Sequence, residues 1–226
     1  MSGIKKIQQR VSSNDQPTST GDRKEIWIND KEQMFFTAVA TGHDDDVHMD
    51  DYYRYGFQSG NRWNYILQDE RLDYKSIIPE GLRAQHMFGL WIYVYDVIHV
   101  EKKVETWDET ETADGRKVFV EHVNDFRILT LSFGMGDANW NKLVNIYSEW
   151  GTLDKGVLRL SRVGTQRNTT YDIMPTTREL EIPEDRQKEI KDLDQIKDYF
   201  YEQADASLRK TSSSESSTTA EIDLGF

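Results

Sequence analysis

The segment Phe88-Gly-Leu-Trp-Ile-Tyr-Val-Tyr-Asp-Val-Ile-His-Val100 carries the clearest strand pattern in this 226-residue chain. Aromatic and β-branched residues favour strands because they pack well on a pleated, half-buried surface. Alternate side chains of a strand point to opposite faces, so Trp91, Tyr93 and Tyr95 are expected to share one face. Such an aromatic row either packs in a core or forms a platform for flat ligands. The sequence leaves both interpretations open.

Shorter strand patterns, each bounded by turn residues, lie on both sides of this segment. Apolar residues spaced at helical intervals before Gly151 predict a helix over Asn139–Trp150, and Pro183 opens a second helix. Several short strands with one mid-chain helix indicate a small antiparallel β-barrel. The shorter strand patterns are Gln33–Ala40, Tyr52–Phe57, Asn61–Tyr65, Val104–Trp107 paired with Lys117–Val120 across Asp114-Gly115, Gly156–Val163 and Thr169–Met174. The expected apolar stripes are Trp140, Leu143, Val144, Tyr147 and Trp150 in the first helix, and Ile190, Leu193, Ile196 and Phe200 in the second.

Composition divides the chain into four regions. Residues 1–22 are polar and predict a disordered N-terminal arm, which is followed by the barrel domain over residues 23–178. We expect the C-terminal helix over residues 179–206 and a flexible acidic tail over residues 207–226. The tail contains the Ser/Thr-rich run Thr211–Thr219, which can bury almost nothing and should stay solvated.

The tail ends in Glu221-Ile-Asp-Leu-Gly-Phe226. Apolar groups on a flexible tether have no core of their own to enter. We therefore expect Asp223, Leu224 and Phe226 to bind a pocket on a partner protein. A frayed terminus that carries apolar residues by chance is the alternative.

Charge and composition exclude several classes of protein. The net charge is −12, of which residues 179–226 contribute −7, so the barrel domain is closer to neutral than the total indicates. The absence of cysteine excludes disulfides, thiolate zinc sites and cysteine nucleophiles, and fits a reducing compartment. No secretory or membrane-spanning apolar run is visible, so we expect a cytoplasmic protein with no membrane partner.

Aromatic residues alternate with arginines along the barrel strands. Flat rings stack on bases and guanidinium groups pair with phosphates, so this interleaving suits single-stranded DNA. The alternatives are that the rings pack in the core and that the arginines lie on a solvated hairpin. The candidate DNA-binding residues are Arg54, Phe57, Arg62, Trp63, Tyr65, Trp91, Tyr93, Tyr95, Arg159, Arg162, Arg167 and Tyr171.

Catalytic and metal sites are not indicated by the sequence. It contains neither a glycine-rich phosphate loop nor a Gly-x-Ser-x-Gly elbow, and the five histidines lack the spacing of ligands. The acidic loop Asp44–Asp51 could hold Mg²⁺ in a nuclease, but neighbouring carboxylates on a loop are usually only solvated. We expect no enzyme activity, no cofactor and no metal.

A resemblance to a known family rests on the later part of the barrel domain. The runs Asn139-Trp-Asn-Lys-Leu-Val-Asn-Ile-Tyr-Ser-Glu-Trp-Gly-Thr-Leu-Asp154, Gly156-Val-Leu-Arg-Leu-Ser-Arg-Val-Gly164 and Thr169-Thr-Tyr-Asp-Ile173 follow Phe126-Arg-Ile-Leu. In this order they resemble the single-stranded-DNA-binding proteins of tailed bacteriophages. The resemblance is best over residues 126–175 and implies an OB-fold.

The resemblance also implies a function. Relatives of this kind bind and protect single-stranded DNA during phage replication and recombination, in the cytoplasm of the infected bacterial host cell. Their acidic, Phe-terminated tails recruit replication or recombination proteins. Many relatives carry a Cys-rich zinc ribbon after the segment that corresponds to Trp63, but this chain has no cysteine there, so zinc dependence is not expected.

The sequence therefore predicts a mainly β protein, an OB-like antiparallel barrel with two helices and disordered termini, that binds single-stranded DNA without catalysis. We further expect the acidic tail to compete for a basic groove, so that deletion of residues 207–226 tightens DNA binding at low salt. The main alternative is a protein-interaction adaptor, a replication or transcription cofactor that has no nucleic-acid groove.

Overall fold

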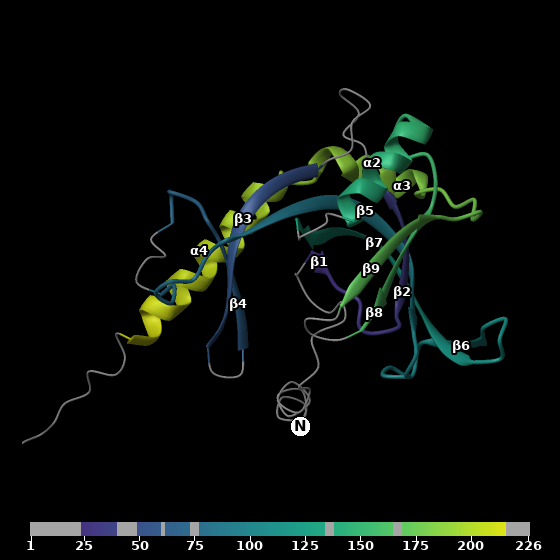
Figure 1. Ribbon diagram of the computed structural model, residues 1–226, viewed down its shortest axis with the longest axis horizontal. Coiled ribbons are helices and arrows are strands. Elements are labelled where there is room, and N and C mark those ends of the chain that lie inside the picture. The colour runs from purple at the N-terminus through teal and green to yellow at the C-terminus, as the bar shows by residue number, and fades with distance from the viewer. Residues whose placement is uncertain are drawn as a thin grey trace, which may run out of the picture.

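The computed structural model describes residues 24–39, 49–59, 62–72, 77–133, 138–164 and 169–215, with only the backbone at 59, 62, 63 and 206–215. Within these ranges the strands form one curled sheet with the shape of a half-barrel (Figure 1). No helix in the described ranges is long and apolar enough to cross a membrane.

The sheet follows the order β1-β7-β5-β2-β8-β9, with β3 beside β5, β4 beside β3 and β6 beside β7. Every pair is antiparallel except β1 with β7. The predicted mainly β, OB-like fold is confirmed. The strands are β1 (Glu25–Ile26), β2 (Gln33–Ala38), β3 (Met49–Ser59), β4 (Arg62–Leu67), β5 (Gln85–His99), β6 (Asp108–Glu111), β7 (Lys117–Ser132), β8 (Leu158–Val163) and β9 (Thr170–Pro175). The helices are α2 (Ala138–Trp150), α3 (Glu184–Gln187), the 3₁₀ helix η2 (Lys188–Asp192) and α4 (Ile196–Glu215).

Strand β5 lies at the centre of the fold and contributes to a hydrophobic core on each of its faces. It pairs with β2, β3 and β7. Leu90, Ile92 and Val94 belong to the inner core of the half-barrel. Trp91, Tyr93 and Tyr95 belong to the outer core on the opposite face. The alternation read from the sequence therefore separates two cores.

The hairpin predicted at Asp114-Gly115 is present, but its first strand lies later than expected. Gly115 has the positive φ of 77° that a tight turn requires. Strand β6, Asp108–Glu111, pairs with β7, whereas the predicted strand Val104–Trp107 is irregular. Trp107 is instead buried against His99.

Helix α2 presents a different face to the core from the predicted stripe. Leu143 and Ile146 are buried, whereas Val144 and Tyr147 are each 41% exposed. Trp140 and Trp150 pack against the inner core from the ends of the helix. The predicted stripe was therefore only partly right, because the curved sheet contacts one edge of it and leaves the other in solvent.

The outer core is covered by residues 178–204, here called the C-terminal cover. The side chains of the aromatic row hold its backbone. Trp91 Nε1 donates a hydrogen bond to Asp194 O at 2.8 Å, and Tyr95 OH donates one to Leu180 O at 3.2 Å. Two ion pairs anchor the cover, Arg178–Asp96 and Arg186–Asp125. Figure 1 shows that the long helix α4 crosses β3 and β5.

Gly89, in the middle of β5, allows the cover to approach closely. A Cβ atom at this position would lie 2.8 Å from Ile196 Cγ2, a distance that real Cβ contacts essentially never show. Ile196 is fully buried at the start of α4. A glycine inside a strand often marks such a close approach.

The second predicted helix is broken into α3, η2 and α4. Leu193 is extended, with φ −71° and ψ 129°, and interrupts the helical backbone. This break leaves Asp194 O free of a helical hydrogen bond, so that it accepts the indole N–H of Trp91. The backbone of α4 then continues to Glu215, beyond the predicted tail boundary at residue 207, because Leu208, Arg209 and Lys210 are good helix formers.

A buried histidine joins the end of β5 to its neighbours. His99 is 1% exposed, and its ring nitrogens lie 2.8 Å from Glu32 Oε1 and 3.0 Å from Glu121 Oε2. Burial alone would lower the pKa of His99, but the hydrogen bonds from Glu121 and Glu32 outweigh it and raise the pKa. Burial alone would raise the pKa of Glu32, but hydrogen bonds from His99 and Asn29 outweigh burial and lower this pKa.

The raised pKa of His99 predicts a pH dependence of stability. A group whose pKa is higher in the folded state stabilises the fold fully below its unfolded pKa, about 6.5, and this contribution is lost as pH rises through the folded value. We expect the Tm to fall as the pH rises from about 6.5 through the higher pKa that His99 has in the folded protein. His99→Gln should lower the Tm throughout and flatten this slope. His122→Gln is the comparison: the pKa of His122 is also raised, but its side chain is 55% exposed, so this variant should flatten the slope less than His99→Gln. A slope unchanged in His99→Gln would contradict the assignment.

Candidate nucleic-acid interface

An open cavity of about 390 Å³ lies at the mouth of the half-barrel and is called the groove below. Residues of β3 and β4 line one side and residues of β8 and β9 the other, with Trp27 and the ends of β5 and β7 also in the lining. Four predicted site residues line it together: Arg54, Tyr65, Arg162 and Tyr171. These residues come from four strands that the sequence separates by up to about a hundred positions.

Strands β8 and β9 place Arg162 beside Tyr171. The two residues are opposite each other in the ladder, and the guanidinium carbon lies 5.8 Å from the tyrosine ring centroid. Arg162 Nη1 donates a hydrogen bond to Ile28 O at 2.6 Å, which holds the side chain across the mouth. Arg162 Nε is buried and has no hydrogen-bond partner within the described ranges. Arg162 forms no ion pair with a described carboxylate, so its positive charge at the groove is not neutralised by a neighbour.

Tyr171 is held as a neutral phenol. Burial raises the pKa of Tyr171, the positive charge of Arg162 lowers it, and the neighbouring Tyr65 raises it further. A neutral hydroxyl can donate and accept hydrogen bonds, while its ring offers a flat apolar face. Both properties suit contact with a base.

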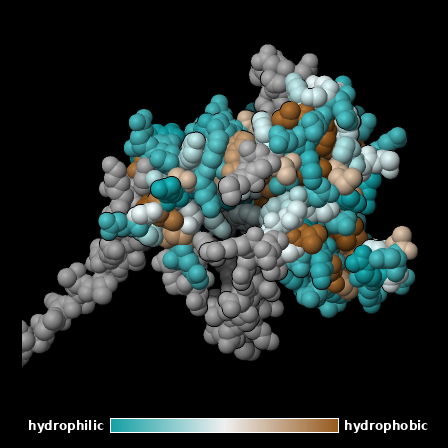
Figure 2. Space-filling model, viewed as in Figure 1, coloured by the Kyte–Doolittle hydropathy of each residue, from teal (hydrophilic) through white to brown (hydrophobic). Residues whose placement is uncertain are grey.

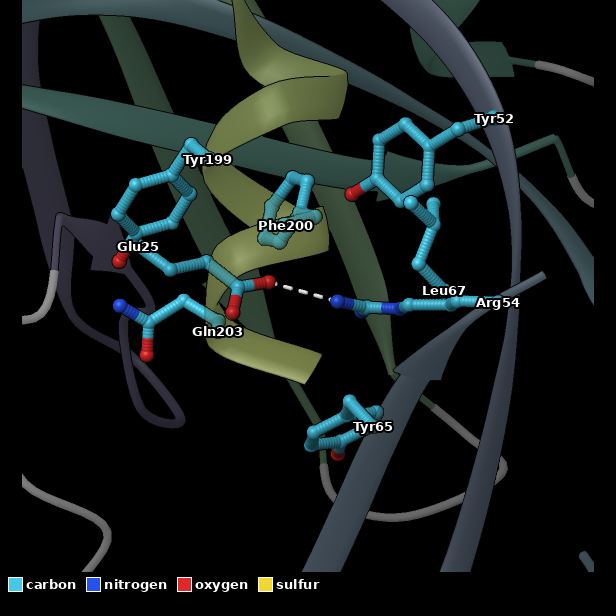
Figure 3. Close-up of a pocket in the computed structure, with 8 residues that line it drawn as sticks. All are labelled: Glu25, Tyr52, Arg54, Tyr65, Leu67, Tyr199, Phe200 and Gln203. Atoms are coloured by element: carbon cyan, nitrogen blue, oxygen red, sulfur yellow. Dashed lines mark hydrogen bonds and ion pairs between the residues drawn. The ribbon is translucent and has the colours of Figure 1, made fainter. Parts of the chain in front are cut away.

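Arg54 supports the opposite wall without offering a free charge. Its Nη1 lies 2.6 Å from Glu25 Oε1, and the same oxygen accepts a hydrogen bond from Thr130 Oγ1. Its guanidinium carbon stacks 4.5 Å from the Tyr65 ring centroid. Figure 3 shows this ion pair between helix α4 and Tyr65. Arg54 therefore orients Tyr65, and its charge is already balanced by Glu25.

Trp27 completes the aromatic lining and was missed in the sequence analysis. It lies between the buried residues Ile26 and Ile28 and is half-buried, with its ring centroid 6.4 Å from that of Tyr65 at an interplanar angle of 27°. The alternation Glu25-Ile-Trp-Ile28 contained the signal, because it places the indole on the face opposite to the two isoleucines. Rings from β4, β9 and the segment after β1 thus meet in one groove.

Asn139, the first residue of the predicted helix, was not among the predicted site residues, yet it lines the groove. Its Oδ1 atom is buried and has no hydrogen-bond partner within the described ranges. Gln85, Ser132 and Thr169 add further neutral polar groups. Such groups can accept or donate hydrogen bonds to base edges and sugars. No pattern in the sequence connects these four positions.

The other predicted residues lie elsewhere. Arg159 faces outward from β8 beside Phe35 and Met174, on the side opposite to Arg162. Phe57 packs against the outer core. Trp91, Tyr93 and Tyr95 are at most 6% exposed, so the core interpretation describes them in this structure and a base cannot reach their faces. The side chains of Arg62 and Trp63 lie outside the described part, as do Arg167, Asp223, Leu224 and Phe226.

The charge around the groove is locally favourable to an anion. Its lining contains two arginines and, among the described residues, no carboxylate, and because Glu25 balances Arg54, the favourable charge is that of Arg162. Figure 2 shows that the described surface in this view is mostly hydrophilic, with apolar residues in small separate groups. The described residues contain no group of three or more His, Asp or Glu placed to hold a metal ion, and residues 44–48 of the acidic loop lie outside them.

The groove thus combines three rings, an arginine that forms no ion pair with a described carboxylate, and several neutral polar groups on an OB-like half-barrel. No protein-family model matches the sequence, and no curated protein is significantly similar to it, so a function has to be inferred from the site itself.

Proposed function

We propose that this protein binds single-stranded DNA in the groove, without catalysis and with little dependence on sequence. The observation that carries the proposal is the convergence of Trp27, Tyr65 and Tyr171 with Arg162 in one open site, whose described lining residues include no carboxylate. Stacking on such rings tolerates any base and contributes roughly 1–3 kcal/mol per base, while arginine neutralises the backbone. The low pI does not oppose this, because a local field need not follow the net charge.

The wider role follows from the resemblance of residues 126–175 to the single-stranded-DNA-binding proteins of tailed bacteriophages. We infer protection of single-stranded DNA during phage replication or recombination, in the cytoplasm of the host cell. The tip Asp223, Leu224 and Phe226 would recruit replication or recombination proteins.

Tryptophan fluorescence during titration with a dT oligomer tests the proposal. We expect saturable quenching by the single strand, weak quenching by a duplex of equal length, and an affinity that falls with salt at a slope near −0.7 per phosphate contacted. Trp27→Phe should retain binding, measured by anisotropy of a labelled oligomer, and lose much of the quenching. Absence of binding at low salt would leave the adaptor function as the alternative.

A further inference from the structure

Three stacked rings and a fourth, tilted ring lie next to the groove and are here called the ring column: Tyr53, His86, Phe133 and Trp140. Tyr53 and His86 are parallel within 9° with centroids 4.5 Å apart, and His86 and Phe133 are within 24° at 4.3 Å. Trp140 closes the inner end, 5.3 Å from Phe133. At the outer end Tyr53 is 48% exposed, so only one of its ring faces can be covered by His86.

Each ring of the column is the sequence neighbour of a residue that lines the groove. The pairs are Tyr53 with Arg54, His86 with Gln85, Phe133 with Ser132, and Trp140 with Asn139. In the two pairs that lie within strands, Tyr53 with Arg54 and His86 with Gln85, the neighbours point to opposite faces of the sheet. Strand β5 begins at Gln85 and β7 ends at Ser132, so the sheet ends at these two residues. This edge of the sheet is called the lip below, and the ring column lies behind it.

We propose that the ring column is a second stacking subsite for single-stranded DNA. The DNA leaves the groove across the lip, and one of its bases stacks against Tyr53. This proposal rests on the function proposed above. An exposed tyrosine fixed on one side by a parallel ring is a preformed flat surface, and a base added there continues the stack.

Charges at the lip suit a phosphate on one side only. Arg83 is exposed, lies two residues before Gln85 and makes no ion pair within the described ranges. On the other side Asp51 Oδ2 lies 2.8 Å from His86 Nε2, and its carboxylate would repel a phosphate. The backbone of a bound strand is therefore expected on the Arg83 side, with a base over Tyr53.

The test compares Tyr53→Ala with Tyr147→Ala across dT oligomers of about 4 to 16 nucleotides. Tyr147 is a matched control: it is 41% exposed and lies eight residues, about 12 Å, along α2 from Asn139. We expect Tyr53→Ala to bind the shortest oligomers like the wild type and the longest about tenfold more weakly. Tyr53→Phe should behave as the wild type. Tyr53→Leu, which keeps apolar contact with His86, should repeat the loss if the flat face is what matters.

The outcomes separate the two proposals. If Tyr53→Ala and Tyr53→Leu match Tyr147→Ala at every length while the wild type binds, the ring column is not a subsite and the groove proposal stands. If the wild type binds no dT oligomer, both proposals fail. Equal weakening by Tyr53→Ala at all lengths, with an unchanged Tm, would place Tyr53 inside the primary site and would also overturn the subsite.

Discussion

Arg162→Ala is expected to weaken the binding of single-stranded DNA by about tenfold at moderate salt and to reduce the salt slope by about 0.7. The guanidinium of Arg162 lies at the mouth of the groove beside Tyr171 and forms no ion pair with a described carboxylate. Each phosphate contact that is lost removes one unit of counterion release, so the loss should be similar for all oligomer sequences.

Arg159→Ala supplies the control for this prediction. Arg159 lies on the same strand with the same charge, but it faces away from the groove towards Met174. Its removal should change the affinity by less than about twofold. The measurement is fluorescence anisotropy at several salt concentrations, with Tm as a check because Arg162 also donates to Ile28 O. Equal losses from both variants would indicate a diffuse electrostatic effect in place of a contact in the groove.

A chain that ends after Arg178 should fail to fold, whereas a chain that ends after Glu215 should melt close to the full-length protein. The shorter chain lacks nearly all of the C-terminal cover and exposes the outer-core face of Trp91, Tyr93, Tyr95 and Phe126. Burial of one large apolar side chain contributes about 1.5–3 kcal/mol. Four or five such losses total about 10 kcal/mol, which equals the whole stability of a typical domain.

Circular dichroism melts and solubility of the two chains measure this effect. The expected result for the shorter chain is aggregation or a broad, non-cooperative transition. A soluble chain 1–178 with a sharp transition would contradict the assignment of the aromatic row to a core. If that chain also bound single-stranded DNA more tightly, the aromatic row of Trp91, Tyr93 and Tyr95 would be identified as a stacking platform.

Much of the fold could be predicted because its signals are local. The strand over Phe88–Val100, the β3–β4 hairpin and the turn at Asp114-Gly115 depend on residue alternation and turn chemistry, which neighbouring residues carry. The buried face of α2 and the break at Leu193 could not be predicted in the same way. Both depend on where the curved sheet and the indole of Trp91 lie in space.

The residues of the candidate site also divide into those that the sequence identified correctly and those whose accessibility only the structure shows. Arg162 and Tyr171 were selected from composition and lie together in the groove, and the opposite orientation of Arg159 also follows from strand alternation. Trp91 was selected on equal grounds and is buried. Residue type shows which groups can stack on a base, but only packing shows which of them remain accessible.

By itself the sequence determined the strands, their alternating faces and the chemistry available to them, because these properties depend on residues one to four positions apart. The tertiary structure alone decided which aromatic face is covered by the chain's own C-terminal segment and which rings remain open at the mouth of the half-barrel. The physical reason is that burial depends on contacts between segments far apart in the chain. Trp91 is covered by residues about a hundred positions later in the chain, and the residues next to Trp91 in the sequence do not indicate this.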